Sequence, residues 1–541
     1  MLISLFPSIS PLVICCSVVL AVGIACLLRH VLMRQNEDEI SHTGTGKISR
    51  RLGSFERYFS IIASGYSTCY LNTVLLLEFK VKLDPGHLKT ALLMLSERFA
   101  LLRMRITVDN VFQQCFEEME DPQSLEFQTR MDIDSENWMS AFNEHINCAP
   151  FNTEKGPLWR VTLLRETTES EGEGILYKNA LLFSFHHIIC DARSVFEFKN
   201  KLLQFLGSLY NGKAMKVETL AFRPTLERMT LNLTKPNILE RLLIPLLVGC
   251  SKLSAMIRKP KMANLYLLKF PPNVRDSLAQ TTHAIPRCLT KEQTMALVSC
   301  CKANGCTVHG AITAATHLAM KQIIEPEQTE QKPPLLFDSN YTVDIRQQCE
   351  PKLGREEFGL YATFDALQIE VKGTEEFWDF SRTCTNKVHR KIDSGEHMNF
   401  LKLIQCVNLP SLWNLFCSET KHGQRKELFN LTNLGVLSID QEGKSPYKFA
   451  GAYFAVQSAK FPFITGNGIF TINDQLYWTV EYILESLRDL ERKTLLIYHF
   501  VFSWMPVSLK LLNISSPKRR QPVVISTPNH LHSSEWLLII Y

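Results

Sequence analysis

Residues 181–194 have the sequence LLFSFHHIICDARS. The first five are apolar apart from one serine, a pattern that predicts a buried strand. Two histidines, His186 and His187, follow directly, and Asp191 stands four places after the second. A histidine at a strand end can take a proton from a hydroxyl or an amine near neutral pH, because the ordinary pKa of imidazole is about 6.5. The stretch therefore predicts a general base at His187.

A second His-x-x-x-Asp sequence, from His389 to Asp393, shows that this spacing alone is a weak signal. It stands among charged residues at helical spacing, which predicts a solvated surface helix. Only the first copy follows an apolar strand and precedes an amphipathic helix, which is predicted over residues 194–209. The surroundings of the histidine, rather than its spacing from the aspartate, favour His187.

The composition indicates an ordinary globular protein. The chain has 541 residues, of which 45% are hydrophobic and 21% charged, enough for two core-bearing units or one large bilobal unit. A net charge of +5, without a basic stripe interleaved with aromatics, does not indicate nucleic-acid binding. The 16 cysteines include no C-x-x-C pair, so neither a zinc site nor a disulfide framework is predicted. We also find no flavin, nucleotide or phosphate-binding motif.

The first 34 residues predict one transmembrane helix. Residues 2–28 carry no charged side chain, and residues 11–28 alone would span about 27 Å as a helix. A cleaved signal peptide is the main alternative, but the start of the chain lacks the basic residues that such peptides carry. Because Arg29 and Arg34 follow the span, the positive-inside rule predicts a cytosolic C-terminal part. The endoplasmic reticulum is the default expectation for the membrane.

Five segments of the chain occur in the same order as the motifs of a known enzyme superfamily. They are residues 95–105, 151–159, 186–191, 341–346 and 430–435. Together they resemble the CoA-dependent acyltransferase superfamily with the HHxxxD motif. This superfamily includes condensation domains, alcohol acetyltransferases and wax ester synthases. The chain departs from the motif at one place, where Ala192 replaces the usual glycine.

The resemblance implies an α/β fold with two chloramphenicol-acetyltransferase-like lobes, whose mixed sheets form a channel. The predicted organisation is an anchor at 1–34, a linker at 35–50, a first lobe at 51–218, a connector at 219–262, a second lobe at 263–500 and an unassigned tail at 501–541.

Within the predicted connector, residues 239–257 are largely apolar, but they contain Arg241, Pro245 and Lys252. A second membrane span is therefore not expected. Two alternatives remain: a surface helix that dips into the membrane interface, and a buried structural helix.

The resemblance also implies roles for the site residues. Asp191 would be structural and pair with Arg346 across the two lobes, while His187 acts as base. The backbone N–H of Ala192 would stabilise the oxyanion, and Asn433 is a candidate helper from the second lobe. His186 is expected to be a packed neighbour. Acyl transfer through the Cys190 thiol is disfavoured, because the adjacent carboxylate raises a thiol pKa.

Three functions follow as hypotheses. The first is transfer of an acyl group from acyl-CoA to an alcohol, which the predicted membrane anchor favours because it places the site beside lipophilic alcohols. The second is amide formation with an amine acceptor or a carrier-bound acyl group. The third, prompted by Ala192, is a catalytically silent protein that binds acyl-CoA or a partner. Acyl-CoA would be a co-substrate, no bound cofactor or metal is expected, and the sequence does not indicate an oligomeric state.

Overall fold

The structure is a computed structural model. It describes residues 40–42, 46–66, 69–110, 112–171, 174–213, 215–257, 281–324, 334–412, 427–439, 446–458, 461 and 463–483. The predicted transmembrane helix and the predicted tail lie outside these residues. In the part of the chain that is described, none of the helices has the length and apolar character needed to cross a bilayer.

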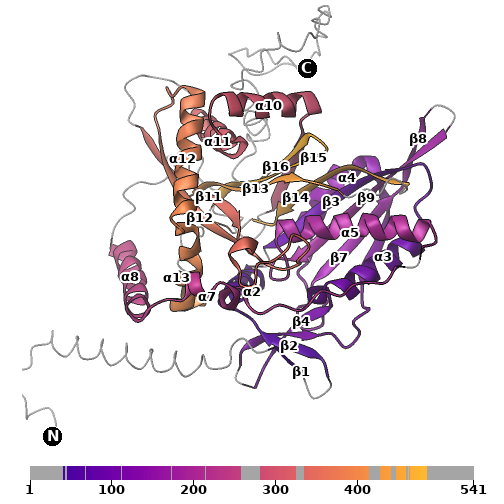
Figure 1. Cartoon of the computed structure of the whole chain (residues 1–541), viewed down its shortest axis with the longest axis horizontal. Coiled ribbons are helices and arrows are strands. Elements are labelled where there is room, and N and C mark those ends of the chain that lie inside the picture. Colours follow the sequence, from indigo (N-terminus) through magenta and orange to yellow (C-terminus); the bar gives the residue numbers. More distant parts are fainter. Residues whose placement is uncertain are drawn as a thin grey trace, which may run out of the picture.

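The first lobe is built on a six-stranded sheet (Figure 1). Five of its strands follow the order β14-β3-β9-β7-β6, and β8 pairs with the outer part of β9. Their bounds are β3 Tyr70–Phe79, β6 Glu126–Asp134, β7 Trp159–Arg165, β8 Thr167–Glu171, β9 Gly174–His186 and β14 Tyr447–Val456.

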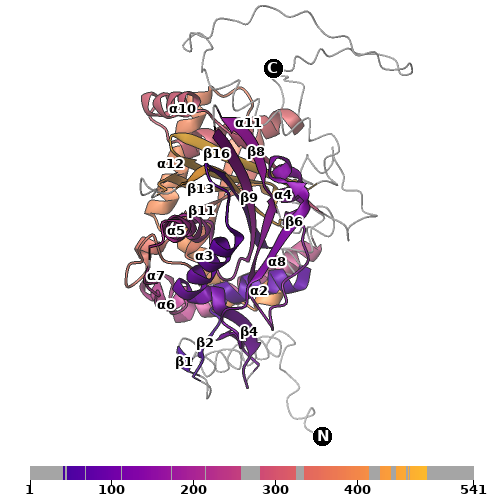
Figure 2. The same cartoon turned by 90° about the vertical axis from the view of Figure 1, so that its right-hand side faces the viewer.

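Helices cover both faces of this sheet because the side chains of a strand alternate between faces. On β9, Phe183 packs edge to face against Phe198 of α5 (Ala192–Tyr210). The next residue, Ser184, points the other way and contacts His145 of α4 (Trp138–Ile146) at 2.8 Å. Helix α3 (Pro85–Arg98) packs beside α5. Figure 2 shows these two helices on one side of the sheet and α4 on the other side.

A small four-stranded sheet adjoins the first lobe, in the order β1-β2-β5-β4. Its strands are β1 Ser41–His42, β2 Ile48–Arg51, β4 Met104–Val108 and β5 Gln114–Glu118. The linker predicted at residues 35–50 therefore contains β1 and most of β2. Strand β1 pairs with β2, and β2 pairs with β5, about 65 residues further along the chain. Helix α2 (Ser54–Tyr66) follows, and the 3-10 helices η2 (Ala100–Arg103) and η3 (Ser135–Asn137) precede β4 and α4.

The second lobe has its own six-stranded mixed sheet, in the order β10-β16-β15-β13-β11-β12. The pairs β11·β13 and β13·β15 are parallel, and the others are antiparallel. The strands are β10 Thr282–Cys288, β11 Leu335–Asp344, β12 Ala362–Val371, β13 Glu427–Leu437, β15 Phe463–Ile472 and β16 Gln475–Ile483. The helices are α10 Lys291–Ala303, α11 Val308–Ile324, α12 Phe377–Asp393 and α13 Asn399–Cys406, with the 3-10 turns η5 Arg346–Gln348 and η6 Glu396–Met398.

Strand β14 crosses from the second half of the chain into the first lobe. It pairs antiparallel with β3 over most of its length, and Thr73 Oγ1 donates to Tyr453 O at 2.6 Å. The predicted boundary of the second lobe, residues 263–500, is wrong in this respect. The apolar residues 452–455 of β14 are buried in the core of the first lobe. Without β14, strand β3 would be an unpaired edge of the sheet.

The predicted connector holds three helices, α6 Leu226–Met229, α7 Leu231–Thr234 and α8 Ile238–Ile257. A third apolar cluster lies between the lobes and includes residues of α2, α6, α13 and the segment 345–361. Phe55, Ile345 and Leu401 are among its buried members. The two lobes are therefore joined by a shared core as well as by the β14 crossover.

Candidate active site

His187 lies directly after β9, between the first lobe and helix α2. Its backbone N–H donates to Cys69 O at 3.4 Å, and its ring stacks on Phe59, with the ring centroids 4.8 Å apart and the planes 25° from parallel. Burial lowers the pKa of His187, and backbone hydrogen bonding at His187 and Cys190 together with the charge of Asp191 opposes this shift. The imidazole is therefore neutral at pH 7 and has the protonation state of a base.

His186 has a different environment, although it is the adjacent residue. It is buried at the end of β9, where its Nδ1 accepts a hydrogen bond from the N–H of Ile188 at 3.3 Å and its ring meets Tyr70 edge to face. Burial, followed by the neighbouring charge of His187, lowers the pKa of His186 to about 3. His186 is thus a neutral, packed histidine, in the role expected from the sequence.

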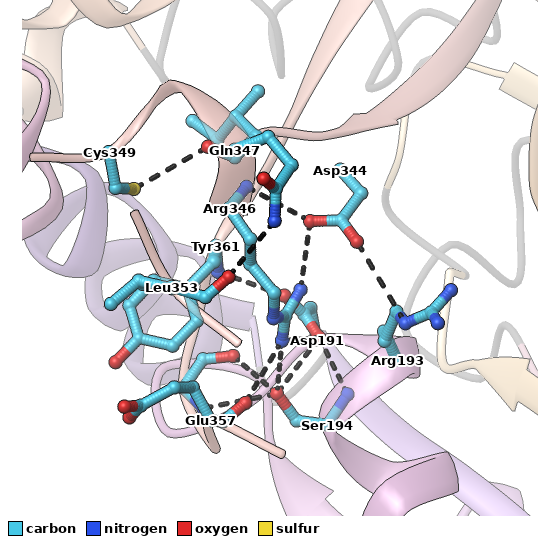
Figure 3. Close-up of polar contacts among 12 residues, drawn as sticks. Asp191, Arg193, Ser194, Asp344, Arg346, Gln347, Cys349, Leu353, Glu357 and Tyr361 are labelled. Atoms are coloured by element: carbon cyan, nitrogen blue, oxygen red, sulfur yellow. Dashed lines mark hydrogen bonds and ion pairs between the residues drawn. The ribbon is translucent and has the colours of Figure 1, made fainter. Parts of the chain in front are cut away.

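Asp191 is buried and accepts hydrogen bonds on both carboxylate oxygens (Figure 3). Oδ1 receives the N–H of Ser194 at 2.8 Å, as the N-cap of α5, and Oδ2 receives the N–H of Tyr361 at 2.9 Å. Burial alone would raise the pKa of Asp191, but the charge and hydrogen bond of Arg346 and the two backbone amides lower it. Asp191 is therefore an ionised structural carboxylate.

Arg346 comes from η5 in the second lobe and forms the ion pair that the resemblance implies. Its Nη2 lies 3.0 Å from Asp191 Oδ1, and its Nη1 lies 3.0 Å from Asp344 Oδ1. The guanidinium also lies over the ring of Tyr361, 5.0 Å from its centroid. Burial would lower the pKa of Arg346, but the charges of Asp191 and Asp344 raise it above its ordinary value. The pair joins α5 of the first lobe to the end of β11.

Ser194 stands at the centre of this network, and sequence reasoning did not assign it a role. Its Oγ accepts from Arg346 Nη2 at 2.8 Å and from Gly359 N at 3.0 Å. The hydroxyl proton has two acceptors within reach, Asp191 Oδ1 at 2.9 Å and Gly359 O at 2.7 Å. The signal in the sequence that could have indicated this role is the presence of a polar residue in the first helical turn after the motif. Its partners in the second lobe, Arg346 and Gly359, however, lie more than 150 residues away in the chain.

The carboxylate of Asp191 accepts its hydrogen bonds from groups that hold α5 and the second lobe together. In the described part of the chain, no hydrogen bond joins the side chains of Asp191 and His187. Asp191 acts on His187 through its charge, which favours the protonated imidazole. The arrangement is thus a clamp beneath the histidine rather than a proton relay.

Ala192 is the first residue of α5. The first N–H groups of a helix have no intrahelical partner. The amide of Ser194 is capped by Asp191, whereas that of Ala192 makes no hydrogen bond to another described residue. Ala192 does not have a positive φ, so alanine at this position carries no backbone strain. Its free N–H, at the positive end of the helix dipole, suits a developing negative charge.

Asn433 lies in β13, at a register shift relative to β15 between Asn433 and Val436. Its Oδ1 accepts the N–H of Gly435 at 2.9 Å, and Gly435 has φ +72°. The side-chain oxygen is thus used in a local turn. No described contact links Asn433 to His187 or Ala192, so the structure does not bring it together with the other candidates.

Two cysteines lie beside the motif. Burial, followed by the charge of Asp191, raises the pKa of Cys190 well above that of a free thiol, which makes it a poor nucleophile. Cys69 is buried and has φ +72°, a conformation that costs energy for a residue with a side chain. Because its carbonyl accepts from His187 and its N–H donates to Gln457 O at 2.9 Å, Cys69 links β3, β14 and the histidine. Nothing in the sequence marked this position.

No group of three or more His, Cys, Asp or Glu side chains is placed to hold a metal ion among the residues that the structure describes.

Two family models match the chain, one on each half. The condensation domain matches residues 57–227, and the phthiocerol/phthiodiolone dimycocerosyl transferase C-terminus matches residues 280–440. A search of curated protein sequences found no match.

Solved structures with the same fold cover most of the chain. Trichothecene 15-O-acetyltransferase from Fusarium sporotrichioides has a TM-score of 0.60 at 12% identity, over 87% of this chain and 97% of that one. Polyketide synthase associated protein 5 from Mycobacterium tuberculosis has a TM-score of 0.56 at 12% identity, over 84% and 98%. The epimerization domain of tyrocidine synthetase B has a TM-score of 0.57 at 13% identity, over 87% and 97%. The two halves of the chain thus match family models of the CoA-dependent acyltransferase superfamily, the superfamily that the ordered motifs resemble.

Proposed function

We propose that the protein transfers an acyl group from acyl-CoA to the hydroxyl group of a lipophilic alcohol, with His187 as general base. The observation that carries this proposal is the pairing of a neutral histidine with a free helix-terminal N–H, that of Ala192, five residues later. The two groups supply a proton acceptor and a hydrogen-bond donor, which acyl transfer requires.

In the proposed reaction the imidazole of His187 takes the proton of the acceptor hydroxyl as its oxygen attacks the thioester carbonyl. The tetrahedral intermediate then collapses, the C–S bond breaks, and the imidazolium returns the proton to the leaving CoA thiolate. A lowered pKa of His187 keeps the ring unprotonated at neutral pH, and its stacking on Phe59 restricts its rotation. General base catalysis of this kind contributes about 10²–10⁴ in rate.

The oxyanion of the tetrahedral intermediate would be bound by the N–H of Ala192. The clamp of Asp191, Ser194 and Arg346 holds the start of α5 in place, so the donor needs no rearrangement when charge develops. Asn433 is not needed for this step, since its side-chain oxygen already contacts Gly435.

An alcohol acceptor is favoured over an amine by two similarities. One solved relative is named a 15-O-acetyltransferase, and the matching C-terminal family model is named after a dimycocerosyl transferase of phthiocerol. The match to the condensation domain keeps amide formation as the alternative. The predicted N-terminal anchor at residues 1–34 supports a lipophilic acceptor and, with the basic residues after it, a cytosolic site at a membrane such as the endoplasmic reticulum.

The test is release of CoA thiol by the purified full-length protein, measured with a panel of acyl-CoAs against pooled alcohols and pooled amines. His187→Ala is expected to lower the acceptor-dependent rate by about 10²–10⁴. The matched control is His389→Ala, which changes the exposed histidine of the second His-x-x-x-Asp sequence and is expected to leave the rate unchanged.

Turnover with alcohols that is lost in His187→Ala alone supports the proposal. Turnover only with amines would establish the amide-forming alternative. If the wild type and both variants bind acyl-CoA equally and none of them releases CoA, the protein is a silent binder and the proposal is wrong.

A further inference from the structure

Helix α8 presents a row of apolar side chains to solvent. They recur at positions i, i+1, i+4, i+5, i+8 and i+9, which lie on one face of a helix. Their exposed fractions are Ile238 74%, Leu239 62%, Leu242 45%, Leu243 42%, Leu246 51% and Leu247 64%. Single exposed leucines are ordinary, but a contiguous row of six marks a surface that binds something apolar. We call this row the α8 face.

The two charged residues in the first turn of α8, Glu240 and Arg241, make their contacts with the protein. Glu240 pairs with Lys402 of α13 at 3.6 Å, and the amide of Glu240 is capped by Asn237 Oδ1 at 2.8 Å. Arg241 folds back so that its Nε donates to Pro236 O at 3.2 Å. Figure 1 shows α8 at the left edge of the molecule, beside α13. Over residues 238–247 the usual amphipathic arrangement of a surface helix is thus reversed, with the two charged side chains toward the protein and the leucines toward solvent.

The charge of the sequence from the first turn of α8 onward indicates what binds to the α8 face. From residue 241 to residue 275 the chain has no Asp or Glu. Over the same stretch it has seven basic residues, namely Arg241, Lys252, Arg258, Lys259, Lys261, Lys269 and Arg275. A leucine-rich face followed by a sequence whose charged residues are all basic complements a surface that is apolar inside and negative outside. An anionic lipid bilayer has both properties.

We infer that α8 binds in the interface of an anionic lipid bilayer, with its axis along the membrane surface and the α8 face among the acyl chains. The helix contains Glu240, Arg241, Pro245 and Lys252, and it does not meet the requirements of a membrane span. It therefore lies on the bilayer rather than across it. This inference goes beyond the proposed function and holds for a silent protein as well.

Hydrogen exchange of the full-length protein reports on α8 separately from any contact made by the N-terminal residues. Vesicles of phosphatidylcholine that contain phosphatidylserine are expected to slow deuterium uptake in residues 238–249 about tenfold or more, whereas exchange in α12 stays unchanged. Vesicles of phosphatidylcholine alone, or added salt, are expected to protect less, because the basic residues then contribute little.

The variant Leu243→Gln with Leu247→Gln removes two members of the α8 face and should weaken both the protection and the vesicle affinity by about tenfold or more. Met295→Gln on α10 is the matched control, since Met295 has a similar exposed fraction of 55%. Both sites are exposed, so the fold of the variants should be intact, which exchange in β9 and β11 would verify.

Three results would overturn the inference. The first is unchanged exchange of α8 on anionic vesicles, and the second is equal protection in the wild type and the double variant. The third is protection that rises with protein concentration in the absence of lipid, which would assign the α8 face to a second copy of the chain.

Discussion

The two His-x-x-x-Asp sequences have the same spacing but opposite surroundings. In the first, His187 follows a strand and Asp191 caps the start of α5, so the two residues belong to different elements. In the second, His389 and Asp393 both lie near the end of α12, where both are exposed. Asp191 therefore sits at the positive end of a helix dipole, and Asp393 at the negative end of another. The chemistry of the motif therefore comes from the junction between a strand and a helix.

The largest expected difference between the two copies concerns folding stability. Arg346→Met would leave the buried carboxylate of Asp191 without its cation, and we expect the free energy of unfolding to fall by about 3–5 kcal/mol. Urea denaturation at pH 7 measures it. Asp393→Asn, in the second copy, is expected to cause no measurable change.

A double variant, Asp191→Asn with Arg346→Met, distinguishes the loss of the ion pair from general damage. Because it removes both charges, it should be more stable than Arg346→Met alone. If Arg346→Met unfolds at the wild-type urea concentration, the clamp does not join the lobes energetically, and the structural contrast between the two motifs has no consequence for stability.

The next difference is the free N–H that follows the first motif. Ala192→Pro removes this donor but keeps the helix, since proline is well tolerated at the first helical position. The preceding residue, Asp191, has φ −106° and ψ 174°, the extended conformation that a following proline requires. We expect kcat to fall about 10²–10³-fold at unchanged stability. In the second copy the corresponding Ser394 closes a helix and has no such N–H to lose, because its amide donates to Arg390 O at 2.9 Å.

Ala192→Gly is the control for this substitution. It retains the N–H and restores the residue usual in the superfamily, so activity should stay within a few-fold of wild type. Full activity of Ala192→Pro would show that another group binds the oxyanion.

The pH dependence of the reaction tests whether Asp191 acts on His187 through its charge. Burial lowers the pKa of His187, so kcat/KM should stay constant as the pH falls to about 6.5 and decline only below it, when the imidazole becomes protonated. The charge of Asp191 raises the pKa of His187, and therefore Asp191→Asn should move this decline to a still lower pH. A shift to higher pH would contradict the electrostatic role. The pH at which kcat/KM declines does not depend on the fraction of the variant that is folded, so the test is independent of stability.

Local patterns predicted the elements around the first motif well. The strand expected at residues 181–185 lies within β9, Gly174–His186, and the helix expected at 194–209 is α5, Ala192–Tyr210. The helix starts two residues earlier than expected because Asp191 caps it. Apolar periodicity and a capping residue are local signals, and each was visible in a window of about 20 residues.

Contacts between distant segments were not predictable in the same way. Strand β14 pairs with β3, and Tyr453 lies 380 residues from Thr73, so no local pattern could place it in the first lobe. The positive φ of Cys69 likewise depends on its two backbone partners, because cysteine has no intrinsic preference for that conformation. Resemblance to a known family supplied the pairing of Asp191 with Arg346, which lies 155 residues away.

The smallest expected effect concerns the ring that stacks on His187. Phe59→Leu keeps an apolar side chain of similar size but removes the aromatic contact, so we expect kcat to fall about 2–10-fold and stability by less than about 1.5 kcal/mol. Phe55→Leu is the matched control on the same helix, since Phe55 packs against Phe59 with centroids 5.1 Å apart and not against His187. Equal losses of activity in the two variants would mean that the packing of α2, rather than the stacked ring, holds the histidine. A loss confined to Phe59→Leu would show that the first histidine differs from the exposed second one partly because its ring is fixed.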